Sequence, residues 1–246
     1  MKILVCISRT ADTTAKIAFT SNNTKFDETD VQFIINPYDE WYALVRALEL
    51  KEKIGATVQL ISVGGPETDP LLRRGLSYGL DSAVRVNCSN TDPFQIASQI
   101  AVHARSEGID LILTGKETID YNGSSVGGMV AALLGIPFIS LATKFDLEGS
   151  KATVHREMEG GEETCEADLP LVVSCQKGVA EMRMINIRGI QTARSKPFQV
   201  LEPEPCQNRI QYLDFELPQA KAGVKLVPAD QPEELVRLLH EEARVI

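Results

Sequence analysis

Glycines and a lysine follow two apolar segments of this sequence. The first segment ends in VGGP (Val63–Pro66), and the second, Leu111–Thr114, continues into a loop that begins with Gly115 and Lys116. Glycine lets the backbone approach a ligand closely, and the free N–H groups at the start of a helix attract phosphate. Because a helix is expected from Ser124 onward, the two loops favour a site for a nucleotide or another anion.

The common nucleotide fingerprints are absent. The sequence contains no Gly-x-Gly-x-x-Gly followed by an acidic residue about 20 positions later, and no Gly-x-x-x-x-Gly-Lys-Ser/Thr. Gly115 and Gly123 are equally compatible with ordinary strand-to-helix turns. On spacing alone, nucleotide binding and simple turn formation therefore both remain open.

Side chains suited to hydrolysis, thiol redox chemistry or metal binding are scattered along the chain. No Ser/His/Asp set falls at strand ends, the five cysteines include no Cys-x-x-Cys pair, and the three histidines are isolated. The glutamates between positions 157 and 166 are typical of a solvated hairpin surface. We expect no catalytic residue and no bound metal.

Composition and charge restrict the partners. The chain has 246 residues, of which 43% are hydrophobic and 24% charged, as in ordinary globular proteins. Its formal charge of -9 argues against a protein that binds nucleic acid or anionic membranes with its whole surface. No apolar stretch approaches the roughly 20 residues that span a bilayer, and the apolar start ILVCI is too short for a signal peptide. We expect a cytoplasmic protein without direct membrane insertion.

The elements that position the glycine-containing loops alternate between strand and helix. Strands are expected at Lys2–Ser8, Val58–Val63, Ala83–Val86 and Leu111–Thr114, and helices from the N-cap Asn36 to Gly55 and at Pro70–Tyr78, Pro93–Glu107 and Ser124–Leu134. Strands separated by helices form a parallel sheet, in which the apolar Leu111–Thr114 should be central. Ligands of doubly wound sheets lie beyond the carboxyl ends of the strands, which here are the loops after Ser8, Ile35, Val63 and Thr114.

The pattern changes after Pro137. Three extended segments predict an antiparallel meander: Phe138–Leu147, Lys151–Met158 and Thr164–Asp168. A further strand is expected at Leu169–Cys175. Earlier in the chain, Lys16–Phe19 and Val31–Ile35 form a hairpin or a loosely extended excursion around Asn22–Asn23. The fold class is thus α/β, with a doubly wound, mostly parallel sheet and an antiparallel meander. Residues 1–197 form this domain. Residues 198–246, with a last helix at about Pro232–Arg244, form an extended C-terminal arm that packs on another chain.

One segment is strongly basic. Lys177–Pro197 contains five bases and one acid in an acidic chain. These bases form a docking surface, remain solvated, or pair with the acidic hairpin Glu157–Glu166 of the same chain.

Four stretches resemble the β subunits of electron transfer flavoproteins. They are NPYDEWYALVRALELKEK (Asn36–Lys53), LTGKETIDYNGSSVGGMVAALLGIP (Leu113–Pro137), VHREMEGGEETCEADLPLVVS (Val154–Ser174) and IRGIQTARSKP (Ile187–Pro197). The resemblance runs from Lys2 to about Pro197, and the hairpin around Gly160–Gly161 is its most specific part.

The resemblance implies an electron-carrier subunit without acid, base or nucleophilic chemistry of its own. Its α-subunit partner holds most of the FAD, and this chain holds an AMP or, as in electron-bifurcating members, a second FAD. Electrons arrive from flavin dehydrogenases such as acyl-CoA dehydrogenases and leave toward a quinone oxidoreductase. The matching cofactor-binding positions are Cys6, Asn36, Pro37, Tyr38, Asp39, Gly64, Gly115, Lys116, Glu117, Thr118, Ile119, Asp120, Asn122, Gly123, Ser124, Ser125 and Val126.

In the same family the basic segment corresponds to the recognition loop that docks dehydrogenases. The matching residues are Arg183, Ile187, Arg188 and Arg194, with Ile187 at the position of the apolar anchor. Ser125–Val126 and Ala180–Met184 depart from the usual family residues, so AMP and FAD both remain open. A freestanding nucleotide-binding regulatory domain on the same fold is the alternative function.

Overall fold

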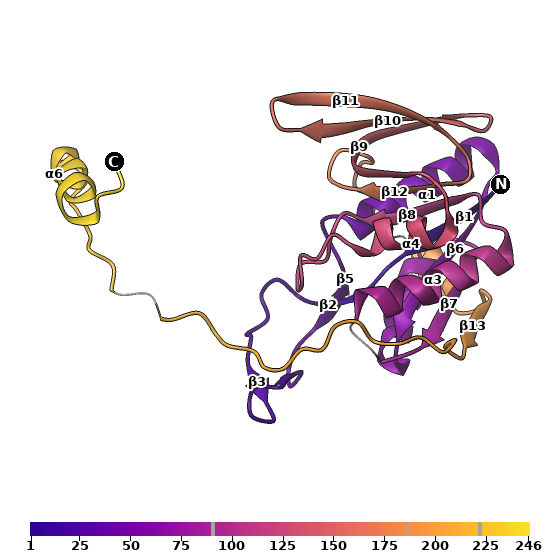
Figure 1. Ribbon diagram of the computed structural model, residues 1–246, viewed down its shortest axis with the longest axis horizontal. Coiled ribbons are helices and arrows are strands. Elements are labelled where there is room, and N and C mark those ends of the chain that lie inside the picture. The colour runs from indigo at the N-terminus through magenta and orange to yellow at the C-terminus, as the bar shows by residue number, and fades with distance from the viewer. Residues whose placement is uncertain (90–91, 186, 221–222) are drawn as a thin grey trace.

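The computed structural model describes residues 1–89, 92–185, 187–220 and 223–246. Within these residues nine strands form one sheet (Figure 1). Their order is β11 (Gly161–Asp168), β10 (Lys151–Met158), β9 (Phe138–Glu148), β12 (Leu171–Cys175), β8 (Leu111–Gly115), β1 (Lys2–Cys6), β6 (Thr57–Gly64), β7 (Ser82–Asn87) and β13 (Phe198–Leu201). The pairs β9–β10 and β10–β11 are antiparallel and the other pairs are parallel. The expected doubly wound sheet with a meander is therefore confirmed.

Helices cover both faces of the sheet. On one face, α1 (Glu40–Ile54) and α2 (Asp69–Leu76) pack against side chains such as Ile3 and Val5. On the other face, α3 (Pro93–Glu107) and α4 (Val126–Leu134) pack against Leu4 and Cys6. Successive strand residues point to opposite faces, so both alternating sets must be apolar. The four residues Leu111–Thr114 are buried, and β8 lies inside the sheet as expected.

Two helices begin later than the sequence pattern indicates. We expected Asn36 to be the N-cap of α1, but the N-cap is Asp39 and the helix begins at Glu40. Asn36 is buried, and its side-chain amide donates to the carbonyl of Glu117 at 2.6 Å, so it holds a distant loop instead. Helix α4 begins at Val126, two residues after the expected start, because Ser124 has a φ of 47°, outside the helical region.

The region between β1 and α1 pairs differently from the expected hairpin. Lys16–Phe19 does not pair with Val31–Ile35; instead β2 (Arg9–Ala11) pairs with β5 (Phe33–Ile35), and β3 (Phe19–Thr20) pairs with β4 (Lys25–Phe26). Asn22 and Asn23 have positive φ values of 57° and 62°. They form a tight turn that pairs the residues on its two sides, so the inner hairpin is much shorter than expected.

The C-terminal segment first adds to the sheet and then leaves it. Strand β13, the first four residues of the expected arm, pairs in parallel with β7. Before it, α5 (Ile187–Ala193) lies inside the basic segment. The chain then crosses the body and extends away from it (Figure 1). It ends in α6 (Pro232–Arg237), which continues into a π-helical segment at Leu238–Ala243, close to the expected last helix. None of the helices in the described residues is long and apolar enough to cross a membrane.

Candidate functional site

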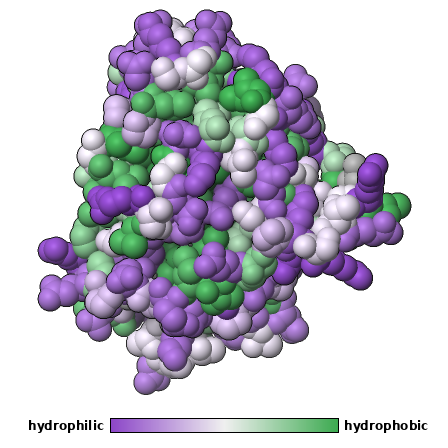
Figure 2. All heavy atoms as spheres, turned by 90° about the vertical axis from the view of Figure 1, so that its right-hand side faces the viewer, coloured by the Kyte–Doolittle hydropathy of each residue, from purple (hydrophilic) through white to green (hydrophobic). Residues whose placement is uncertain are grey.

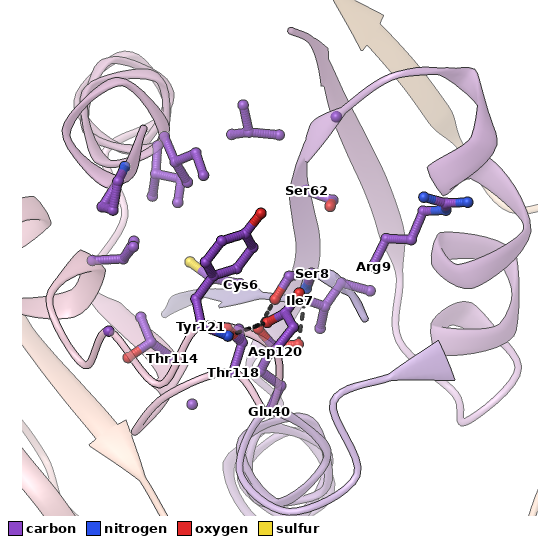
Figure 3. Close-up of a pocket in the computed structure, with 18 of the residues that line it drawn as sticks. Cys6, Ile7, Ser8, Arg9, Glu40, Ser62, Thr114, Thr118, Asp120 and Tyr121 are labelled. Carbon is purple, nitrogen blue, oxygen red and sulfur yellow. Dashed lines mark hydrogen bonds between the residues drawn. The ribbon is translucent and has the colours of Figure 1, made fainter. Parts of the chain in front are cut away.

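A cavity of about 530 Å³ opens at the carboxyl ends of β1, β6 and β8 (Figure 3). Strand β1 lies between the other two, and the helices that follow β1 and β8 pack on opposite faces of the sheet. This is the point at which a doubly wound sheet leaves a crevice. The side of the molecule that lies on the right in Figure 1 presents interspersed hydrophilic and hydrophobic side chains (Figure 2). The cavity therefore lies at the edge that the sequence indicates.

Many of the expected cofactor-binding residues meet at this cavity. Those that line it are Cys6, Gly64, Gly115, Lys116, Glu117, Thr118, Asp120, Gly123, Ser124, Ser125 and Val126. Asn36, Pro37, Tyr38, Asp39, Ile119 and Asn122 are not in the lining. Asn36 and Asp39 are buried behind the loop that follows β8, whereas Tyr38 is 58% exposed. Ligand contact by any of these residues remains a prediction.

Two glycines bring backbone close to neighbouring side chains at the cavity edge. A Cβ on Gly64 would lie 2.4 Å from Oγ1 of Thr68, and a Cβ on Gly115 would lie 2.8 Å from Cγ and 2.9 Å from N of Glu40. No side chain fits at either position without displacing its neighbour. The end of β8 therefore packs directly on the start of α1 at the edge of the cavity.

The start of α4 gives the cavity a cluster of hydrogen-bond donors. The first N–H groups of a helix have no intrahelical acceptor, and the N-cap Ser125 makes no side-chain capping hydrogen bond. Ser125, Val126 and Gly127 all line the cavity. Together with the helix dipole, these donors make an anion site of the kind that holds phosphate.

The charged side chains of the lining are predominantly acidic. Of the two basic residues in the described lining, Arg9 pairs with Glu28 at 2.6 Å and Lys116 pairs with Glu117 at 3.1 Å. Burial raises the pKa of Glu40 to about 7, although hydrogen bonds from Ser8 oppose the shift. Because both cations are already paired, an anion would be held mainly by backbone N–H groups.

Two hydroxyl groups at the cavity have no partner within the described residues. Oγ of Ser62 and Oγ1 of Thr114 are buried and make no hydrogen bond. Both residues line the cavity, and the two side chains come from β6 and β8 (Figure 3). Buried polar groups are almost always paired, so these hydroxyls are suited to a ligand that can donate and accept hydrogen bonds. No group of three or more His, Cys, Asp or Glu side chains in the described part of the chain could hold a metal ion.

Sequence reasoning missed several lining residues. Ser62 lies before a strand end that was recognised, so the switch-point rule could have included it. Tyr121 lies inside a recognised loop. Ile210 and Tyr212 come from the C-terminal arm. No local pattern connects them with β1, β6 or β8, which lie far earlier in the chain.

The basic segment exposes both charge and apolar surface. Ile187, the first residue of α5, is 76% exposed, and Arg188 and Arg194 are also exposed. Arg183 pairs with Glu52 at 2.8 Å. Three glutamates of the acidic hairpin pair within the meander instead of with the basic segment: Glu162 with Lys144 and His155, Glu163 with Arg156, and Glu166 with Lys151. The expected alternative, in which that hairpin neutralises the basic segment, finds no support in these ion pairs.

Comparisons with known proteins agree over almost the whole chain. The model of the electron transfer flavoprotein domain matches residues 23–205. The chain is 36% identical to the electron transfer flavoprotein subunit beta of Bacillus subtilis, with 100% of both chains covered. It is 34% identical to the mitochondrial electron transfer flavoprotein subunit beta of Arabidopsis thaliana, again over 100% of both chains. It is 31% identical to the subunit beta of Homo sapiens, over 100% of this chain and 99% of that protein.

Proposed function

The chain belongs to the electron transfer flavoprotein family as a β subunit, and from this premise we propose that it binds an adenine nucleotide in the cavity and carries electrons as part of a heterodimer. The α subunit of that heterodimer holds most of the FAD. The observation that carries the nucleotide proposal is the convergence, at one cavity, of the α4 N-terminus, two close-packed glycines and two unpaired hydroxyls.

The cavity fits the parts of an adenine nucleotide. Its volume of about 530 Å³ lies within the range of small-molecule sites. The N–H groups before and within the first turn of α4 suit the phosphate, because they offer donors without adding a cation. The hydroxyls of Ser62 and Thr114 suit the nitrogen-bearing edge of a base, which both donates and accepts hydrogen bonds. We propose AMP as the nucleotide, with a second FAD as the alternative.

The residues of this chain bind and orient, and they perform no bond chemistry in the proposed function. Bound FAD supplies the one-electron chemistry. Burial of Cys6 raises the pKa of its thiol far above neutrality, so the thiol next to the cavity is no nucleophile. Glu40 has its carboxylate engaged by Ser8 and holds local structure.

The basic segment is the proposed docking surface for electron donors. Ile187 is an exposed apolar side chain with Arg188 beside it. Arg194 lines a hollow between α2 and this segment, together with Arg73, Arg74 and Ile190. Charge steers a transient partner and one apolar side chain fixes it, as brief electron-transfer encounters require. We propose flavin dehydrogenases such as acyl-CoA dehydrogenases as donors and a quinone oxidoreductase as acceptor.

The distal part of the arm is the proposed contact with the α subunit. Leu217, Val224 and Leu226 are between 51% and 87% exposed. An extended segment with apolar side chains in water has no core of its own, so it is suited to cover another chain.

Purification from the native source tests this function. The expected result is an equimolar second chain that contains FAD. After denaturation, mass spectrometry should find one AMP per heterodimer, or one FAD in addition to that of the α subunit. A preparation with a flavin-containing partner but without the additional nucleotide would overturn the assignment of the cavity. A chain that purifies alone would overturn the heterodimer.

A further inference from the structure

The first part of the C-terminal arm is fastened along α3. The side-chain amide of Gln99 donates to the carbonyl of Glu204, and its oxygen accepts from the N–H of Glu204, both at 2.8 Å. Further along, the carboxylate of Asp92 accepts hydrogen bonds from the N–H groups of Arg209 and Ile210. The guanidinium of Arg209 lies 4.9 Å from the ring centroid of Phe94. These contacts guide the arm to the cavity.

The arm then crosses the mouth of the cavity. Ile210 and Tyr212 are part of the cavity lining. Next, the N–H of Phe215 donates to the carbonyl of Asn23 at 2.8 Å, and its ring stacks on Phe19 at 5.2 Å. Residues 204–215 are therefore attached on both sides of the cavity, to α3 and to the β3–β4 hairpin. We refer to residues 204–215 as the strap.

Tyr212 of the strap meets Tyr121 of the loop between β8 and α4. Their ring centroids are 5.3 Å apart with an interplanar angle of 44°, and Tyr212 stacks on Phe215 at 5.8 Å. The ring of Tyr121 points into the cavity (Figure 3). Tyr121 remains 47% exposed and Tyr212 38% exposed, although both are in aromatic contact. A planar ligand group can pack against these two partly exposed rings, because tyrosine side chains have few rotatable bonds to restrict on binding.

We propose that Tyr121 and Tyr212 form the outer wall of the nucleotide site and that the adenine base packs against them. The strap is then part of the binding site. This inference rests on the proposed function, which places an adenine nucleotide in the cavity.

The distribution of charge assigns this wall to the base. Glu28 and Asp120 also line the cavity, and a phosphate beside these carboxylates would be repelled. The N–H groups of α4 provide a better site for the phosphate. If the adenine base packs on Tyr121 and Tyr212, only an uncharged ring lies near the carboxylates of Glu28 and Asp120. Ser62 and Thr114 remain available for hydrogen bonds to its edge.

Nucleotide binding and arm position become linked through this wall. If the base packs on Tyr212, bound nucleotide stabilises the strap in its closed position, and the closed strap strengthens nucleotide binding by the same free energy. The strap leads directly into the part of the arm that exposes Leu217. The nucleotide therefore helps to set the direction in which the distal arm leaves the body.

The test uses the full-length chain with AMP and FAD as probes. Equilibrium dialysis should show that Tyr212→Ala weakens AMP binding about 10-fold, because stacking on an aromatic ring is lost. Tyr212→Phe should bind like the wild type, because the ring and not the hydroxyl makes the contact. Val200→Ala is the matched control, since Val200 lies in β13 before the strap, is 46% exposed and is not part of the cavity lining.

A second measurement reports on the strap itself. Saturating AMP should slow tryptic cleavage after Arg209 in the wild type and in Tyr212→Phe, but much less in Tyr212→Ala. Tyr121→Ala tests the other half of the wall and should weaken binding similarly. If the wild type binds neither AMP nor FAD, the proposed function of the cavity fails, and the wall with it. If the wild type binds AMP and both alanine variants bind equally well without loss of protection, the site stands and the wall is wrong.

Discussion

The carboxylate of Glu40 accepts two hydrogen bonds from Ser8. One oxygen accepts from the backbone N–H of Ser8 at 2.8 Å, and the other accepts from its hydroxyl. Ser8 follows β1, and Glu40 is the first residue of α1. A buried carboxylate thus ties the end of β1 to the start of α1, directly beside the cavity (Figure 3).

The first prediction concerns pH. Burial raises the pKa of Glu40 from 4.5 to about 7. Between these two values the folded chain binds a proton at Glu40 more tightly than the unfolded chain does. The free energy of unfolding should therefore fall as pH rises through this window, by up to about 3 kcal/mol. Glu40→Gln is neutral throughout, so its profile should be flatter, and the variant should be more stable than the wild type at pH 8.

Urea unfolding at pH 5, 6, 7 and 8 measures this difference. Glu159→Gln, an exposed glutamate in the turn between β10 and β11, is the control and should follow the wild-type profile. Some slope should persist in Glu40→Gln, because burial also raises the pKa of Asp39. Parallel profiles for wild type and Glu40→Gln would contradict the prediction.

The second prediction concerns the glycine at the end of β8. A Cβ on Gly115 would collide with both backbone and side-chain atoms of Glu40. Gly115→Ala should destabilise the fold by about 1–3 kcal/mol, as overpacking of a close contact does, and should also weaken AMP binding. Gly161→Ala is the matched control, because a Cβ there meets nothing within 4 Å and the φ is not positive. Equal unfolding midpoints for both variants in urea would argue against this close contact.

Much of the sheet could be predicted from the sequence because its signals are local. The apolar runs at Lys2–Cys6 and Leu111–Thr114 are long enough to identify buried strands, and the order of strands and helices then locates the carboxyl edge. The glycines and polar residues after β8 consequently indicate one wall of the cavity from the sequence alone.

The remaining features depend on contacts between distant residues. Asn36 has the residue type of an N-cap, but its side-chain amide donates a hydrogen bond to the carbonyl of Glu117, 81 positions away. Tyr212 lies in a proline-punctuated segment without periodicity, and only the fold brings it to Tyr121. Strand β13 is short, and its pairing with β7 becomes visible only after the sheet exists.

The third prediction separates two functions within the arm. Deletion of residues 217–246 removes the exposed apolar segment but leaves the strap, so AMP binding should persist while the α subunit no longer co-purifies. Deletion of residues 207–246 removes Ile210 and Tyr212 from the cavity as well, and both functions should be lost. Co-purification of the α subunit with the 217–246 deletion would show that the distal arm is not the contact. Unchanged AMP affinity after the longer deletion would remove the strap from the site.

The last prediction concerns docking at the basic segment. Ile187 is 76% exposed, and Arg188 and Arg194 are exposed in the same segment. Ile187→Ala should slow reduction of the heterodimer by its native flavin dehydrogenase, measured by stopped flow, by an amount that corresponds to about 1–2 kcal/mol for a modest apolar anchor. Val102→Ala is the control, because Val102 is 41% exposed on α3, outside the basic segment.

The two arginines should act on a different step from Ile187. Arg188→Gln with Arg194→Gln should mainly lower the association rate and flatten its dependence on salt, because charge steers the encounter more than it holds the complex. FAD content should stay the same in every variant, since the segment is proposed to contact the donor and not the cofactor. Equal reduction rates for wild type and Ile187→Ala at subsaturating dehydrogenase would show that Ile187 is not the apolar anchor. An association rate that depends on salt as strongly in the double arginine variant as in the wild type would show that other charges steer the encounter.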